Sequence, residues 1–151
     1  MKQQYRHSLT ITLFAMFAFA ACGKEPPSTP STKVDSIVVS VGGFNFTTQL
    51  ADTRAAQELA ALLPLTMNLR ELNGNEKYGN LPRALTTDSR RPGTILAGDI
   101  MLYGDDCLVI FYETFQSSYS YTPIGHISDP THLKEALGTG SVEGLEIKIN
   151  N

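Results

Sequence analysis

Apolar and polar side chains alternate with a period of two through much of residues 34–151. In the segments "FNFTTQL" at 44–50 and "LEIKI" at 145–149, the apolar residues fall at every second position, so they share one face of an extended strand. A more continuous apolar run, 37–41, precedes the first of these segments, and Gly42-Gly43 supplies a turn between the two. This pattern predicts half-buried antiparallel strands that begin with a hairpin.

The segment "DIMLYGDDCLVIFYE", residues 99–113, predicts a second and clearer hairpin. Gly104-Asp105-Asp106 has the composition of a turn, and an apolar strand lies on either side of it. In the first strand, Ile100 and Leu102 fall on one face, whereas Met101 and Tyr103 fall on the other. We therefore expect both faces of this strand to be used.

Two short helices interrupt the strand pattern. The first is expected to run from an Asp52 cap to Leu63, because Pro64 prevents its continuation. The second is bounded by Asp129 as its cap and Gly138 as its stop. Many strands and two short helices favour a mainly β fold, a closed or nearly closed barrel whose ends the helices cover.

Residues 1–21 have the features of a secretory signal. Lys2 and Arg6 precede an uncharged run at 9–21, whose 13 residues are fewer than the ~20 that a membrane-spanning helix needs. The run ends in "FAAC", which resembles a bacterial lipobox, so we expect Cys22 to be acylated, for example with palmitate, and to become the new amino terminus. An ordinary secretory signal followed by a chance cysteine is the alternative.

Charge limits the possible partners. Removing Lys2 and Arg6 with the signal leaves 10 of the 12 basic residues against 15 acidic ones. A mildly acidic protein argues against a nucleic-acid partner and against electrostatic adhesion to anionic lipid. We therefore expect a covalent anchor at Cys22 to hold the protein on a membrane of the bacterial cell envelope, facing the periplasm or the cell exterior.

The rest of the chain divides into a tether and one domain. Residues 22–33 follow the signal with three prolines, two serines and two threonines, a composition typical of an extended linker. Residues 34–151 suit a single domain. If Cys22 is acylated, Cys107 is the one remaining thiol, so no internal disulfide can form and the domain must depend on its core.

Three segments together resemble the cyclophilin-like fold family of small bacterial proteins: "LNGNEKYGNLP" at 72–82, "PGTILAGDIMLYGDDCLVIFYE" at 92–113 and "SYSYTPIGHI" at 118–127. The resemblance extends over about residues 35–149. It implies a cyclophilin-like closed antiparallel β-barrel with two short capping helices, related in shape to cyclophilins, which bind proline-containing peptides in a surface groove. For most members of this bacterial group it implies no established activity.

Isomerase activity is an alternative that the sequence leaves open. The barrier to rotation about an X-Pro bond is ~18–20 kcal/mol, and lowering it requires a positioned donor in a dry pocket. True cyclophilins carry a catalytic arginine in an F-H-R context, which this chain lacks. Arg83, which follows Leu81-Pro82, is the one candidate for that role. A structural module that makes protein contacts is a further alternative.

A binding module that takes a peptide or a small ligand is the main prediction, because loop aromatics offer apolar area with a polar tip. The expected groove has three tyrosines at its rim, Tyr78, Tyr119 and Tyr121, and four residues at its floor, Met101, Tyr103, Phe111 and Phe115. Arg83 is also expected to contact the ligand. The alternative is that these side chains belong to the core. The stretch at 71–82 is equally a simple turn with Glu76 and Lys77 in solvent.

No metal site and no cofactor are predicted. After the signal, His126 and His132 are the only histidines, and they belong to different elements. Cys107 begins a strand without a neighbouring histidine or a cationic cluster, so a buried structural thiol is favoured over a nucleophile.

Overall fold

The computed structural model describes residues 33–151, so the signal segment, Cys22 and nearly all of the tether lie outside the described residues. Within 33–151 there are ten strands and two helices. They are β1 (Ser36–Val41), β2 (Phe44–Leu50), α1 (Arg54–Ala60), β3 (Leu65–Leu72), β4 (Glu76–Asn80), β5 (Gly93–Ile95), β6 (Asp99–Tyr103), β7 (Cys107–Phe111), β8 (Phe115–Ser117), β9 (Thr122–Ile127), α2 (Leu133–Leu137) and β10 (Val142–Ile149). Neither helix in this part of the chain is long and apolar enough to cross a membrane.

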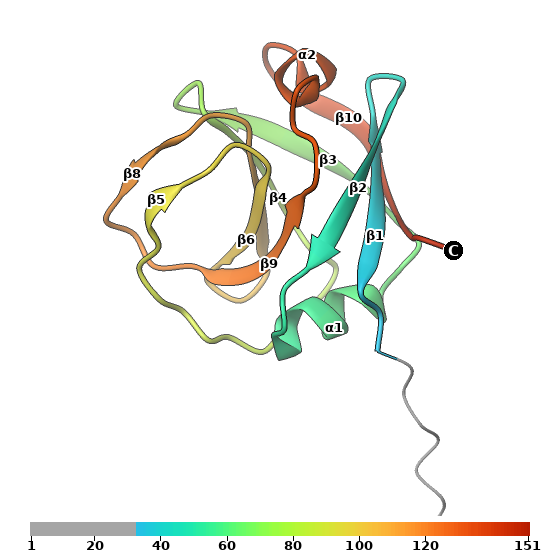
Figure 1. Ribbon diagram of the computed structural model, residues 1–151, viewed down its shortest axis with the longest axis vertical. Coiled ribbons are helices and arrows are strands. Elements are labelled where there is room, and N and C mark those ends of the chain that lie inside the picture. Colours follow the sequence, from blue (N-terminus) through green and yellow to red (C-terminus); the bar gives the residue numbers. More distant parts are fainter. Residues whose placement is uncertain (1–32) are drawn as a thin grey trace, which may run out of the picture. The chain divides into compact units, whose positions relative to one another are not determined.

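Eight of the strands in residues 33–151 close into an antiparallel barrel, in the order β1-β10-β3-β4-β7-β6-β9-β2. Helices α1 and α2 lie near opposite ends of this barrel (Figure 1). The prediction of a mainly β fold with a closed barrel and two short helices is therefore confirmed. Both predicted hairpins are present as β1–β2 and β6–β7.

The turn between β1 and β2 depends on glycine. Gly42 and Gly43 have φ values of 58° and 80°, which L-residues with a side chain rarely adopt. A Cβ atom on Gly42 would also collide with the backbone carbonyl oxygen of Ala136 in α2. The absence of a side chain thus lets the first hairpin pack closely against the second helix.

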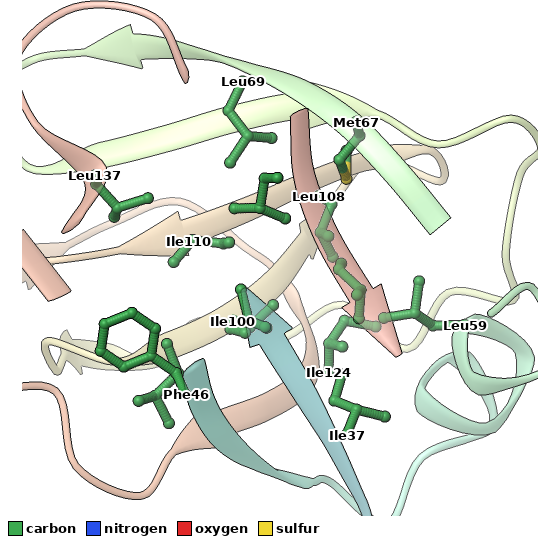
Figure 2. Close-up of a cluster of buried hydrophobic side chains, with 14 of the residues drawn as sticks. Ile37, Phe46, Leu59, Met67, Leu69, Ile100, Leu108, Ile110, Ile124 and Leu137 are labelled. Atoms are coloured by element: carbon green, nitrogen blue, oxygen red, sulfur yellow. The ribbon is translucent and has the colours of Figure 1, made fainter. Parts of the chain in front are cut away.

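The main hydrophobic core fills the barrel interior. Alternate residues of the barrel strands point inward, among them Ile37, Ile100 and Leu108, all of which are at most 1% exposed. Leu59 from α1 and Leu137 from α2 join this cluster, as Figure 2 shows. The two helices therefore cover the interior with apolar side chains, because an open barrel end would leave those strand residues in water.

The first helix differs from the prediction at both ends. Its cap is Thr53, whose hydroxyl accepts a hydrogen bond from the Ala56 N–H at 3.2 Å, whereas Asp52 forms a salt bridge with Lys33. It ends at Ala60, and the N–H of Leu62 then donates to the Leu59 carbonyl in a tighter turn. A residue before proline avoids the helical conformation, so the helix ends well before Pro64.

The second helix is also shorter than predicted. The Asp129 carboxylate accepts hydrogen bonds from the N–H and the hydroxyl of Thr131, in a turn that delays the helix until Leu133. The residue at the cap position is His132, which makes no side-chain capping bond. The predicted stop is correct, since the Gly138 N–H bonds back to the carbonyls of Lys134 and Glu135.

A second hydrophobic layer lies outside the barrel wall. Strands β5 and β8 form a two-stranded sheet (Figure 1). A separate buried cluster packs with this sheet against the outer faces of β6 and β7: Ile95, Met101, Val109, Phe111 and Tyr121. As the sequence predicted, Ile100 and Leu102 face one side and Met101 the other. This outer layer forms the base of the candidate site.

Candidate functional site

A cavity of about 420 Å³ opens beside the outer hydrophobic layer. It is bounded by the β3–β4 turn, by the outward faces of β4, β6 and β7, and by the segment that follows Phe115. Its lining residues are Leu72, Asn73, Asn75, Glu76, Tyr78, Tyr103, Cys107, Val109, Phe115, Tyr119 and Tyr121. The cavity thus has largely apolar and aromatic walls with polar groups gathered at the β3–β4 end.

Three tyrosines form a continuous aromatic wall. The ring of Tyr103 meets the ring of Tyr119 edge-on at 6.2 Å between centroids and lies 5.7 Å from the ring of Tyr121. Tyr119 is 63% exposed, whereas Tyr121 is buried. Such edge and tilted arrangements suit the ring quadrupoles and hold the rings in place. Tyr119 therefore forms the outer rim of the wall, and Tyr121 forms its base.

The structure brings five of the eight predicted site residues to this cavity: Tyr78, Tyr103, Phe115, Tyr119 and Tyr121. Met101 and Phe111, predicted as floor, do not line the cavity but belong to the buried cluster beneath it. The Phe111 ring supports two lining rings, with centroids 5.7 Å from Phe115 and 5.5 Å from Tyr121. Some of the predicted residues therefore line the cavity, whereas Met101 and Phe111 form a buried layer beneath them.

Arg83 lies apart from the cavity. Its side chain is exposed and is absent from the lining residues. The isomerase alternative requires this guanidinium beside an apolar pocket, where water is excluded and a donor gains strength. The geometry does not provide that arrangement.

The expectation that Glu76 and Lys77 lie in solvent is wrong. The stretch from 71 to 82 is a hairpin rather than a loop, with β4 paired to both β3 and β7. Glu76 is 8% exposed on the cavity side, and Lys77 is 0% exposed. The period-two order of "EKYGN", with Glu76 and Tyr78 on one face, was the available signal, but two charges beside glycines favoured a turn.

Glu76 is the one charged residue among the described residues that line the cavity. Burial, and then the nearby charge of Glu71, raise the pKa of the Glu76 carboxyl above its ordinary value. No Lys, Arg or His of residues 33–151 forms a salt bridge with it. Beside it, the Oδ1 atom of Asn75 is buried without a hydrogen-bond partner from the described chain.

Lys77 points the opposite way, into the end of the barrel. Its Nζ atom lies 2.5 Å from Glu71 and donates to the carbonyls of Gly138 and Gly140 at 3.1 and 2.5 Å. The Tyr112 hydroxyl donates to the same Glu71 carboxylate at 2.8 Å. This network ties β3 and β4 to the turn between α2 and β10, so its role is structural.

The network lowers the pKa of Glu71 and raises the pKa of Tyr112. Burial raises the pKa of Glu71, but the hydrogen bonds from Lys77, Tyr112 and the Gly74 N–H together outweigh burial and hold it below the ordinary value. Burial, followed by the hydrogen bond to Glu71, raises the pKa of Tyr112 to about 12. Tyr112 therefore remains a hydrogen-bond donor to an ionised Glu71 through the neutral range.

Cys107 is half-buried on the cavity wall rather than fully buried. Burial, and then the charges of Asp106 and Glu76, raise the pKa of its thiol. A thiol in acidic and partly apolar surroundings stays protonated at neutral pH and is a weak nucleophile. The arrangement therefore gives Cys107 a place on the cavity wall but no activating partner.

The two histidines of the domain lie on separate elements, as expected. The Nδ1 atom of His126 lies 2.8 Å from Asp99, and that of His132 lies 3.2 Å from Glu135. Among residues 33–151, no three His, Cys, Asp or Glu side chains come together in a group that could hold a metal ion.

These features define a class: a closed antiparallel β-barrel domain with helical caps and an aromatic-walled cavity on its outer surface. The chain belongs to the cyclophilin-like family, whose model matches residues 39–148. That range includes every residue that lines the cavity. No curated protein and no solved structure matches the chain.

Proposed function

We propose that the protein is a membrane-anchored lipoprotein whose cyclophilin-like domain binds a peptide or a small ligand in the cavity beside Tyr103. One observation carries the binding proposal. Of the four large apolar side chains that are most exposed in residues 33–151, three line this single cavity: Leu72, Tyr103 and Tyr119. Exposed apolar area that gathers in a concave site is typical of a binding surface.

The composition of the walls supports the same proposal. Rings held by edge contacts lose little freedom when a ligand arrives, and each tyrosine offers apolar area with a hydroxyl at its edge. The cavity volume of about 420 Å³ lies within the ~300–1,000 Å³ common for ligand sites. A structural module that makes protein contacts would instead have its exposed apolar residues spread over an open surface. Their distribution therefore gives that alternative no support.

The binding proposal is tested by nuclear magnetic resonance on the full chain. A collection of small apolar fragments and short peptides, X-Pro peptides among them, would be added while backbone amide shifts are followed. We expect hits to shift the amides of Tyr78, Tyr103 and Tyr121, and Tyr103→Ala to weaken them. Leu96→Ala is the control, because Leu96 is exposed but lies outside the cavity. Hits that map only to other faces, or none at all, would refute the proposal.

The anchor rests on the lipobox-like "FAAC" and the tether after it. Several acyl chains on Cys22 would hold the protein firmly on a membrane, because each buried CH₂ adds ~0.8 kcal/mol. Bacterial cells that produce the full chain would be labelled with an alkyne analogue of palmitate. We expect label on the wild-type chain and on Cys107→Ser but not on Cys22→Ser. Equal labelling of Cys22→Ser would exclude acylation at this cysteine.

A further inference from the structure

We propose that the cavity accepts a primary ammonium group carried on an apolar chain, such as a lysine side chain of a peptide, with Glu76 as its counter-ion. This inference rests on the proposed binding function and specifies the chemistry of its ligand. It is carried by the placement of Glu76, Asn75 and the tyrosine wall around one cavity.

The first step is the charge of the site. Glu76 is 8% exposed, and a carboxylate removed from water needs a partner to offset its lost hydration. The nearest cation in the sequence, Lys77, points into the barrel on the other face of β4, where Glu71 and two carbonyls bind it. The described domain therefore leaves the Glu76 carboxyl without a cation, and the cavity is where one can enter.

The second step is the number of N–H groups on that cation. Asn75 lines the same end of the cavity, and its buried Oδ1 atom has no hydrogen-bond partner from residues 33–151. Buried oxygens without a donor are rare in folded proteins. The Oδ1 atom is itself closed to solvent, so a ligand in the cavity meets it only when the Asn75 side chain turns toward the cavity. A primary ammonium has three N–H donors, enough for the Glu76 carboxylate and for that oxygen, whereas a quaternary ammonium has none. The orphaned oxygen therefore favours the primary amine.

The third step is the wall. Cations are attracted to the faces of tyrosine rings, and the site has Tyr78, Tyr103, Tyr119 and Tyr121 around one acidic group. The apolar stem of a lysine-like group can lie against Phe115 and Val109 while its head meets the carboxylate. A negatively charged ligand meets the reverse conditions, because the cavity lining holds an acid and no base.

Burial, and then the charge of Glu71, raise the pKa of Glu76, because both disfavour a carboxylate that has no cation beside it. An ammonium bound beside the carboxyl would favour its ionised form and oppose both effects. The titratable groups that interact electrostatically with Glu76 are Glu71 on β3, Cys107 on β7, Tyr112 after β7 and Tyr121 before β9, and none of them supplies a positive charge.

The test compares three probes on the full chain by isothermal titration and amide shifts. The probes are Nα-acetyl-lysine-N-methylamide, the norleucine counterpart, which keeps the four-carbon side chain but lacks the ammonium group, and the Nε-trimethyl-lysine counterpart. We expect the lysine probe to bind about tenfold or more tightly than the norleucine probe, the difference that one charged contact commonly makes. We also expect the trimethylated probe to bind more weakly than the lysine probe, because it offers no N–H to Asn75.

Glu76→Gln should remove the preference for the lysine probe over the norleucine probe, because glutamine keeps the shape of the side chain and loses the charge. Glu113→Gln is the matched control, since that carboxylate pairs with Lys134 outside the cavity. The comparison of probes on the wild-type chain needs no variant, so it decides the matter even where Glu76→Gln fails to fold.

The outcomes separate this inference from the binding function on which it rests. Equal binding of lysine and norleucine probes at the cavity would overturn the ammonium inference and leave the binding function in place. A trimethylated probe that binds as tightly as the lysine probe would overturn the assignment of a primary amine. Binding of none of the three probes would also overturn the inference, while the fragment screen decides the binding function independently.

Discussion

The buried network around Lys77 allows a quantitative prediction about stability. Lys77→Met keeps the length and apolar stem of the side chain but removes its contacts with Glu71 and with the carbonyls of Gly138 and Gly140. Breaking a buried ion pair by removal of one partner costs ~3–5 kcal/mol. The Glu71 side chain is 28% exposed and keeps its bond from Tyr112, so water and the tyrosine partly compensate it.

We therefore expect a loss at the lower end of that range, ~3 kcal/mol in the free energy of unfolding. For a domain of this size each kcal/mol shifts Tm by ~3–5 °C, so Tm should fall by about 10 °C. Urea unfolding followed by circular dichroism measures the free energy, and a thermal scan measures Tm. Lys134→Met is the matched control, because the Lys134–Glu113 pair is largely exposed and should contribute less than ~1 kcal/mol.

A double-mutant cycle with Glu71→Gln isolates the pair itself. Residues in one hydrogen-bonded network couple by ~0.5–3 kcal/mol, and the 2.5 Å contact predicts a value in the upper half of that range. If Lys77→Met stays within ~1 kcal/mol of the wild type and the coupling is near zero, the reasoning is refuted. Such a result would mean that the ammonium group stabilises neither the Glu71 carboxylate nor the turn after α2.

Four further predictions follow from individual contacts. Tyr119→Ala should leave Tm within a few degrees of the wild type, because the ring is 63% exposed. It should nevertheless weaken the binding of any fragment that occupies the cavity. A large fall in Tm would contradict the place of Tyr119 at the rim. Gly79→Ala should cost ~1–3 kcal/mol in urea unfolding, because the new Cβ would lie 2.5 Å from the Asn68 carbonyl oxygen. Hydrogen bonds from the Thr86 N–H, Arg54 and the Thr86 hydroxyl lower the pKa of Glu58 from 4.5 to about 2. The contribution of Glu58 to the free energy of unfolding should therefore be complete above pH 4.5 and be lost as pH falls toward 2. Glu58→Gln should flatten the dependence of that free energy on pH in this window. Iodoacetamide should alkylate Cys107 more slowly than a free cysteine at pH 7, because burial raises the pKa of its thiol, and a bound ligand should slow the reaction further.

The strands and their faces could be predicted because the physical cause is local. The alternation in β2 and β6 follows directly from which side chains the barrel buries, and the turns at Gly42-Gly43 and Gly104 need residues that tolerate positive φ. The helix ends were less predictable. Asp52 and Thr53 are both good caps, and the choice between them depends on a distant contact, the bond from the Thr53 hydroxyl to the Pro123 carbonyl.

The tyrosines could be predicted as cavity residues from the sequence because each combines a large apolar ring with a polar hydroxyl, which suits a binding surface in any fold. Glu76 and Lys77 could not be placed in the same way. Whether two adjacent charges are buried depends on partners far along the chain, and the carbonyls that bind Lys77 are more than sixty residues away at 138 and 140. Period two places Met101 and Phe111 on the same face as the cavity residues, but it does not predict their depth beneath another layer of side chains.

Strand β4 separates the two roles that meet in this part of the barrel. Lys77 points inward and contributes to the free energy of unfolding, whereas Glu76 and Tyr78 point outward and line the cavity. Because successive side chains on a strand face opposite sides, a substitution on one face leaves the contacts of the other largely intact. The Lys77 network also holds the strand that carries Glu76 and Tyr78 from behind. A loss of ligand binding without a loss of stability in Glu76→Gln, beside a loss of stability without a loss of binding in Lys77→Met, would therefore show that the two faces of β4 act separately, the inner one in stability and the outer one in recognition.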